Sequence, residues 1–136
     1  MKKILLLTIA MASFQTFAFT SITLKSEAKL VPGRFVKSLY FSTSDERGSD
    51  YCTVTLTSKE NADSLVVAAG TVFEVTSIDQ NACGNDWGHV CRLDLSARNH
   101  EKNVNLSLIC KNKGIFAREL TESKVNKIAK NIISVQ

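Results

Sequence analysis

The chain is poor in the residues and patterns that mark most enzymes, metal proteins and membrane-spanning proteins. Its 136 residues include two histidines, one tryptophan and one proline. No G-x-S-x-G frame singles out a nucleophile. After the first 18 residues there is no long apolar run, so we expect no membrane span in that part. We also find no internal repeat, low-complexity tract or linker, and therefore expect one domain.

A dense basic patch is also missing from the sequence. Lysine and arginine number 17 against 13 acidic residues, and the two signs are interspersed along the chain. The net charge of +4 falls by two if Lys2 and Lys3 are removed with a leader. Nucleic-acid-binding proteins usually concentrate positive charge on one face, so the sequence predicts no nucleic-acid partner.

The opening residues MKKILLLTIAMASFQTFA have the three-part layout of a secretory signal. Two lysines precede a short apolar stretch from Ile4 to Ala12, and Ala18 offers a small residue at a cleavage position. The apolar stretch is far below the ~20 residues that a membrane-spanning helix needs. We predict a cleaved signal peptide over 1–18 and a single domain over 19–136, with a cut after Ala12 as the alternative.

The cysteines agree with export. There are four, Cys52, Cys83, Cys91 and Cys110, and none precedes Cys52, which excludes a lipid-modified N-terminal cysteine. An even count in a small exported chain predicts disulfides, with three pairings available. Cys52 and Cys110 lie on the apolar faces of their strands, whereas Cys83 and Cys91 flank a loop. We therefore predict the pairs Cys52–Cys110 and Cys83–Cys91, in a periplasmic or extracellular protein of bacterial type.

Most of the chain alternates between apolar and polar residues with period two, which is typical of half-buried strands. Polar, turn-like stretches at 45–50, 58–64, 80–86 and 97–103 separate these runs. We predict a mainly β fold, a small antiparallel β-sandwich or partly open barrel. The predicted strand regions are SITLKSEAKL (21–30), RFVKSLYFS (34–42), YCTVTLTS (51–58), SLVVAAGTVFEVTSI (64–78), HVCRLDLSA (89–97) and NVNLSLICK (103–111).

The last segment changes to a helical period. Val125, Ile128, Ala129 and Ile132 follow i, i+3, i+4, i+7 spacing, which predicts a C-terminal α-helix over 122–134. Just before it, Thr121 is a good N-cap, and Leu120 stands at the spacing of a hydrophobic staple with Val125. Lysines at 124, 127 and 130 share the opposite face, which we interpret as solvated; contact with an acidic surface is the alternative.

The stretch NACGNDWGHVCRL (81–93) is the only one that suggests metal chemistry. Cys83, His89 and Cys91, with Asp86, are ligand types that suit zinc or copper. Their spacing is not a recurrent structural zinc spacing, however, and export favours oxidised cysteines. We therefore predict a disulfide-closed loop and neither a metal nor a cofactor.

Catalysis has equally little support. The second histidine, His100, lies in the polar turn ARNHEKN, and Asp45 and Glu46 lie in a Gly/Ser-rich turn, where solvated side chains are the default. His89 has Asp86 nearby, but no nucleophile is marked out beside it. We predict no catalytic residues and keep a small envelope hydrolase using His89 as an alternative.

Trp87, flanked by Gly84 and Gly88 in the same loop, is a candidate binding contact together with Asp86 and His89. The alternative is that Trp87 folds back over the end of the core. We predict a non-enzymatic binding or interaction protein that meets a protein or glycan of the bacterial envelope through the 83–91 loop. A periplasmic inhibitor or immunity-type protein would share the same size, export and disulfides.

The order of four segments, YCTVTL, AAGTVFEV, VNLSLIC and LTESKVNKIAKNIISV, resembles that in a type of small exported bacterial protein. In that type a Tyr-Cys strand precedes a Gly-aromatic strand, and a strand ending in cysteine precedes a short C-terminal helix. The resemblance covers about residues 50–136. It implies the Cys52–Cys110 pairing and a bacterial setting, and it carries no catalytic or binding residues.

Overall fold

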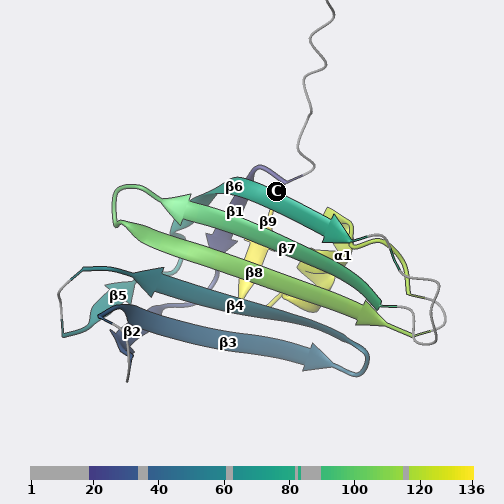
Figure 1. Cartoon of the computed structure of the whole chain (residues 1–136), viewed down its shortest axis with the longest axis horizontal. Coiled ribbons are helices and arrows are strands. Elements are labelled where there is room, and N and C mark those ends of the chain that lie inside the picture. Colours follow the sequence, from purple (N-terminus) through teal and green to yellow (C-terminus); the bar gives the residue numbers. More distant parts are fainter. Residues whose placement is uncertain (1–18, 34–36, 61–62, 82, 84–89, 115–116) are drawn as a thin grey trace, which may run out of the picture.

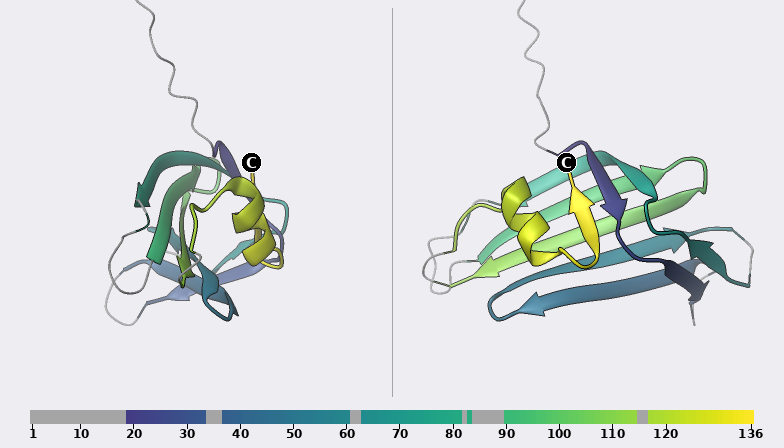
Figure 2. Two further views of the ribbon diagram at one scale, coloured as in Figure 1. Left: turned by 90° about the vertical axis from the view of Figure 1, so that its right-hand side faces the viewer. Right: turned by 180° about the vertical axis from the view of Figure 1, so that it is seen from behind.

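The computed structural model describes residues 19–33, 37–60, 63–81, 83, 90–114 and 117–136. These residues form one curled antiparallel sheet, a half-barrel, with a short helix on its hollow side (Figures 1 and 2). The elements are β1 (Ser21–Leu24), β2 (Ala28–Pro32), β3 (Leu39–Arg47), β4 (Asp50–Ser58), β5 (Leu65–Val67), β6 (Val72–Asn81), β7 (Val90–Asn99), β8 (Val104–Lys113), α1 (Glu122–Ile128) and β9 (Ile133–Val135).

The strands lie in the order β5-β2-β3-β4-β8-β7-β6-β1-β9. The predicted mainly β fold with one C-terminal helix is confirmed. Of the two architectures expected, the single curled sheet corresponds to the partly open barrel and not to the sandwich. Its core fills the hollow side, beneath α1, because alternate residues of each long strand point there.

The period-two alternation predicted the buried faces correctly. In β4, Cys52, Val54 and Leu56 are fully buried, while the threonines between them are half-buried on the outer face. The same alternation runs through β7 and β8, which pair with one another over their whole length. The long strands β3, β4, β8, β7 and β6 therefore form a continuous wall with an apolar inner side and a polar outer side.

The segment 21–30, predicted as one strand, is two strands separated by a bend. Both halves keep one register against the 65–74 segment, because Ile22 lies opposite Phe73 and Leu30 opposite Leu65. At the bend, Gly70 has a φ of 85° and its N–H donates to the Leu24 carbonyl oxygen at 2.7 Å. β1 pairs with β6 and β9, whereas β2 pairs with β3 and β5. The bent segment thus links the two ends of the sheet and curls it.

Several predicted turns are narrower in the structure than the polar stretches suggested. The turn predicted over 45–50 contracts to Gly48 and Ser49, and β3 runs through Arg47. Gly48 has a φ of 62°, a conformation that glycine adopts at little cost. Polar residues near these turns stay in the strands because their backbone groups are paired in the ladder.

The predicted helix over 122–134 is wrong in its second half. Thr121 is the N-cap, as predicted, and its side chain accepts a hydrogen bond from the Lys124 N–H at 3.3 Å. The helix ends at Ile128, and β9 follows as an edge strand beside β1. The β-branched run Ile132-Ile133 with Val135 favours a strand, and pairing with β1 provides one.

The pairing of β1 with β9 joins the two ends of the described chain. The N–H of Gln136 donates to the Ser21 carbonyl oxygen at 3.0 Å. In return, the Ser21 N–H donates to the Gln136 carbonyl oxygen at 3.1 Å. Phe19, the first described residue, is buried. The first and last described segments are therefore part of the same packed sheet (Figure 2).

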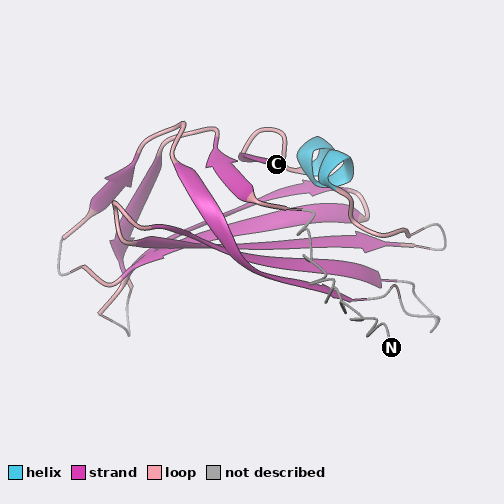
Figure 3. Cartoon of the chain, turned by 90° about the horizontal axis from the view of Figure 1, so that it is seen from above, coloured by secondary structure: helices cyan, strands magenta, loops and turns pink. Residues whose placement is uncertain are grey.

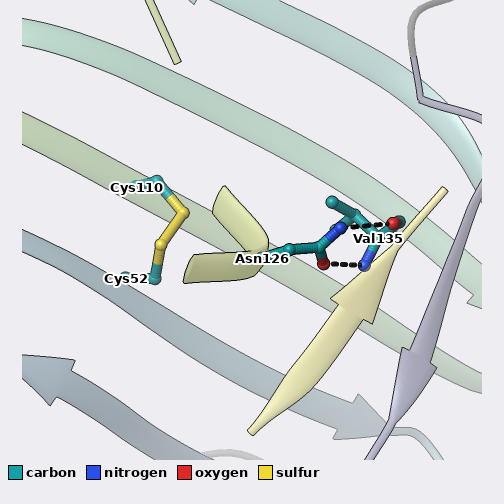
Figure 4. The surroundings of a disulfide bond; sticks show 4 residues. All are labelled: Cys52, Cys110, Asn126 and Val135. Carbon is teal, nitrogen blue, oxygen red and sulfur yellow. Dashed lines mark hydrogen bonds between the residues drawn. A yellow bond between two sulfur atoms is a disulfide. The ribbon is translucent and has the colours of Figure 1, made fainter. Parts of the chain in front are cut away.

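The outer edge of β9 is covered by a side chain of α1. Asn126 donates from Nδ2 to the Val135 carbonyl oxygen at 2.9 Å and accepts at Oδ1 from the Val135 N–H at 2.7 Å (Figure 4). These are the two hydrogen bonds that a further antiparallel strand would make to this residue. Exposed strand edges invite pairing with other chains, and Asn126 occupies this one.

Replacing Asn126 with alanine is expected to lower the free energy of unfolding by about 1–3 kcal/mol, because both Val135 backbone groups lose their partner. Asn126→Asp is expected to lose less stability than Asn126→Ala but to be less stable than the parent chain. A carboxylate can accept from the Val135 N–H but cannot donate to the Val135 carbonyl oxygen. Asn105→Ala, on the exposed outer face of β8, is the matched control. Urea unfolding monitors all three, and equal losses at positions 126 and 105 would contradict this role.

Candidate functional site

Cys52 and Cys110 form the predicted disulfide, with their Cα atoms 4.1 Å apart. They are direct cross-strand partners on β4 and β8, and neither is exposed. The bridge therefore joins neighbouring strands on the hollow side, near α1 (Figure 4), and does not cross the core between distant strands.

Cys83 and Cys91 also form the predicted bond. Cys91 is buried at the start of β7. The bond uses both thiolates that the zinc interpretation required. The predicted contact residues Asp86, Trp87 and His89 lie outside the residues that the structure describes.

One end of the half-barrel, here called the α1 end, carries two acidic residues of the hollow side, Asp45 and Asp50. The β3–β4 turn, the end of β6, the start of β7 and helix α1 all lie there (Figure 1), and Figure 3 shows the helix near this end of the strands. Asn112 at the end of β8 is buried, and its Nδ2 donates to the Arg118 carbonyl oxygen at 3.2 Å. This hydrogen bond ties the segment leading into α1 to the sheet.

An open cavity of about 530 Å³ lies between α1 and the start of β4. Asp50 reaches it from the sheet because Asp50 has the same strand parity as Cys52 and so faces the hollow side. The helix contributes hydroxyl groups, two lysines and one apolar side chain. Among the described residues, the cavity is lined by Asp50, Thr121, Ser123, Lys124, Lys127 and Ile128.

The charged groups of this cavity have no partners within the described part of the chain. The Asp50 Oδ1 atom is buried and makes no hydrogen bond there. Leaving a buried acceptor unpaired costs about 1–3 kcal/mol, and more for a charged group. Neither Lys124 nor Lys127 has a carboxylate partner among the described residues. The cavity is therefore lined by one carboxylate and two lysines that have no charged partner in the described chain, and the Asp50 Oδ1 atom itself is closed off from solvent.

The other predicted polar residues lie elsewhere. His100 Nε2 is 3.8 Å from Glu74 Oε2 on the outer face, and both side chains are mostly exposed, at 69% and 77%. Asp45 faces the hollow side opposite Cys52, and Glu46 is exposed on the outer face. The structure does not bring His100 together with either of these carboxylates.

The outer face of the sheet at the α1 end carries a second set of charged residues. Arg92 Nε contacts Asp94 Oδ1 at 2.8 Å, and this hydrogen bond and its charge raise the pKa of Arg92 above the usual arginine value. Lys111 and Lys113 place their Nζ atoms 5.9 and 5.5 Å from the centre of the Tyr51 ring. Arg92 is thus neutralised by its own neighbour, and the two lysines are held by an aromatic ring.

Sequence reasoning did not find the cavity. It placed Asp50 in a polar turn and interpreted Lys124 and Lys127 as part of a solvated stripe. The stripe divides in the structure, because Lys124 and Lys127 line the cavity and Lys130 does not. The one available signal was the parity of Asp50 with Cys52, which puts a carboxylate on the apolar side of β4.

Comparisons with protein-family models, with curated proteins and with solved structures gave no match for this chain. Across the described residues, no cluster of three or more histidine, cysteine or acidic side chains has an arrangement that could hold a metal ion. In the same part of the chain, no helix has both the length and the apolar character needed to cross a bilayer.

Proposed function

We propose that the chain is an exported, non-enzymatic binding protein of the bacterial envelope, and that the α1-end cavity is part of its contact surface. The observation that carries the proposal is an open cavity lined by the Asp50 carboxylate on the sheet and by Lys124 and Lys127 on the helix, none of which has a charged partner in the described chain. A concave site with a few converging polar groups beside an apolar side chain is typical of ligand binding.

The two disulfides support the compartment. Disulfides persist in oxidising environments such as the periplasm and the cell exterior. They add to the signal-like opening residues, which remain the basis for proposing export.

The disulfide loop belongs to the same proposal. Cys83 and Cys91, which bound the proposed contact residues Asp86, Trp87 and His89, stand at the α1 end, where β6 ends and β7 begins. The partner we propose is a protein or glycan of the envelope. A periplasmic inhibitor or immunity-type protein would use the same surface, and the identity of the partner distinguishes it.

A photo-crosslinking amino acid at position 123 tests the proposal, because Ser123 lines the cavity. The mature chain carrying it is illuminated in its own cell envelope, and adducts are identified by mass spectrometry. We expect one enriched adduct, reduced about tenfold when Lys124→Gln and Lys127→Gln are added, since charge-assisted contacts are lost.

The same crosslinker at position 105, on the exposed outer face of β8, is the control for random encounter. Lys29→Gln with Lys59→Gln removes the same charge from exposed positions outside the cavity lining and should leave the adduct unchanged. Equal adducts from positions 105 and 123, or none from position 123, would count against a contact at the cavity.

A further inference from the structure

The α1-end cavity has groups of opposite charge on opposite walls. Asp50 projects from the start of β4, on the sheet, whereas Lys124 and Lys127 project from the helix. These groups make no salt bridge with one another in the described chain. The ligand complementary to both walls therefore carries a positively charged hydrogen-bond donor at one end and an anionic group at the other.

The hydroxyl groups of the cavity narrow the choice of ligand. The Thr121 hydroxyl already accepts from the Lys124 N–H, so its oxygen serves the helix. Ser123 supplies a second hydroxyl, and Ile128 supplies an apolar surface that is itself nearly buried, at 5% exposure. The site thus combines an acid, two ammonium groups, a hydroxyl and a small apolar patch.

The size of the cavity fits a small molecule. A volume of about 530 Å³ falls within the range of sites that enclose ligands of several tens of atoms or fewer. A short peptide with free ends has an ammonium group for Asp50, a carboxylate for the lysines and an apolar side chain for Ile128. A single anion would leave the Asp50 carboxylate without an opposite charge, and a single cation would leave both lysines without one.

We infer that this cavity binds a short zwitterionic peptide, with its ammonium group at Asp50 and its carboxylate at Lys124 and Lys127. The inference rests on the proposed binding function and names the ligand class for the same site. It gives Asp50 and the lysines separate tasks, so the two ends of a ligand can be tested one at a time.

The test titrates the folded chain with trialanine, with N-acetyl-trialanine and with trialanine amide, and follows binding by isothermal calorimetry. We expect trialanine to bind at least tenfold more tightly than either blocked peptide, because each block removes one charged contact. This ligand series uses the unaltered protein, so it does not depend on any variant folding.

Variants then assign each end of the peptide. Asp50→Asn should bind trialanine about tenfold more weakly and should no longer distinguish it from N-acetyl-trialanine. Lys124→Met with Lys127→Met should lose the distinction between the free acid and the amide. Asp63→Asn, at an exposed position, is the control and should behave as the parent chain.

Equal binding of all three peptides, or no binding of trialanine at millimolar concentration, would overturn the inference. Glucosamine, which has an ammonium group and hydroxyls but no carboxylate, is the comparison for sugar ligands, and binding as tight as that of trialanine would also overturn it. The crosslinking result at position 123 is independent: an envelope partner captured there without trialanine binding would leave the proposed function standing and remove only this ligand class.

Discussion

Replacing Cys52 and Cys110 together with alanine is expected to lower the free energy of unfolding by about 4 kcal/mol. The two residues are 58 positions apart in sequence, so their bridge removes a large closed loop from the unfolded ensemble. Alanine keeps the backbone hydrogen bonds that pair β4 with β8, so the strand pairing stays in place while the cross-link disappears. Total stabilities of small domains are about 5–15 kcal/mol, so this loss is a large fraction of the whole.

The Cys83→Ala with Cys91→Ala variant is the matched comparison. Its loop spans only 8 positions, and the same loop-entropy argument gives about 2–3 kcal/mol. Urea unfolding followed by circular dichroism measures both variants against the parent chain. The loop-entropy account is wrong for this protein if the short-loop variant loses as much stability as the long-loop one.

Replacing Phe73 with alanine is the second large effect, an expected loss of about 3–5 kcal/mol. Phe73 lies on β6 opposite Ile22 of β1, and both side chains are fully buried. The truncation leaves a cavity where β1 approaches the bend that curls the sheet, and the chain on either side is held by backbone hydrogen bonds. We therefore expect little collapse to fill the space.

The neighbouring residue provides the control. Val72 is 50% exposed on the outer face of the same strand, so Val72→Ala is expected to change stability by about 0.5 kcal/mol or less. Thermal unfolding and urea unfolding compare the two variants. A loss at position 72 similar to that at position 73 would show that the inner face is not the core described here.

The inner faces and the disulfides could be predicted because they depend on local parity. Cys52, Cys91 and Cys110 all lie on apolar faces of alternating strands, so the pairing of Cys52 with Cys110 also needed Cys91 to be assigned to Cys83. Cys83 and Cys91 needed only their position around one loop. The N-cap at Thr121 is likewise set by its near neighbours.

The features that escaped prediction depend on contacts between distant segments. Residues 133–135 form a strand because β1 offers an edge more than a hundred positions away, and no local pattern records that edge. The bend at 25–27 is equally non-local, since β1 and β2 find different neighbours. The cavity needed the position of α1 over β4, so Asp50 and Lys124 were visible as residues but not as one site.

The hydrogen bonds between the first and last described segments also affect the order in which the strands can pair during synthesis. A ribosome makes residues 21–24 more than a hundred positions before residues 133–136, so β1 lacks one of its two neighbours until that later segment has been made. Contacts of such long sequence separation form late and slow the folding of a β domain. Until then β1 keeps an unpaired edge.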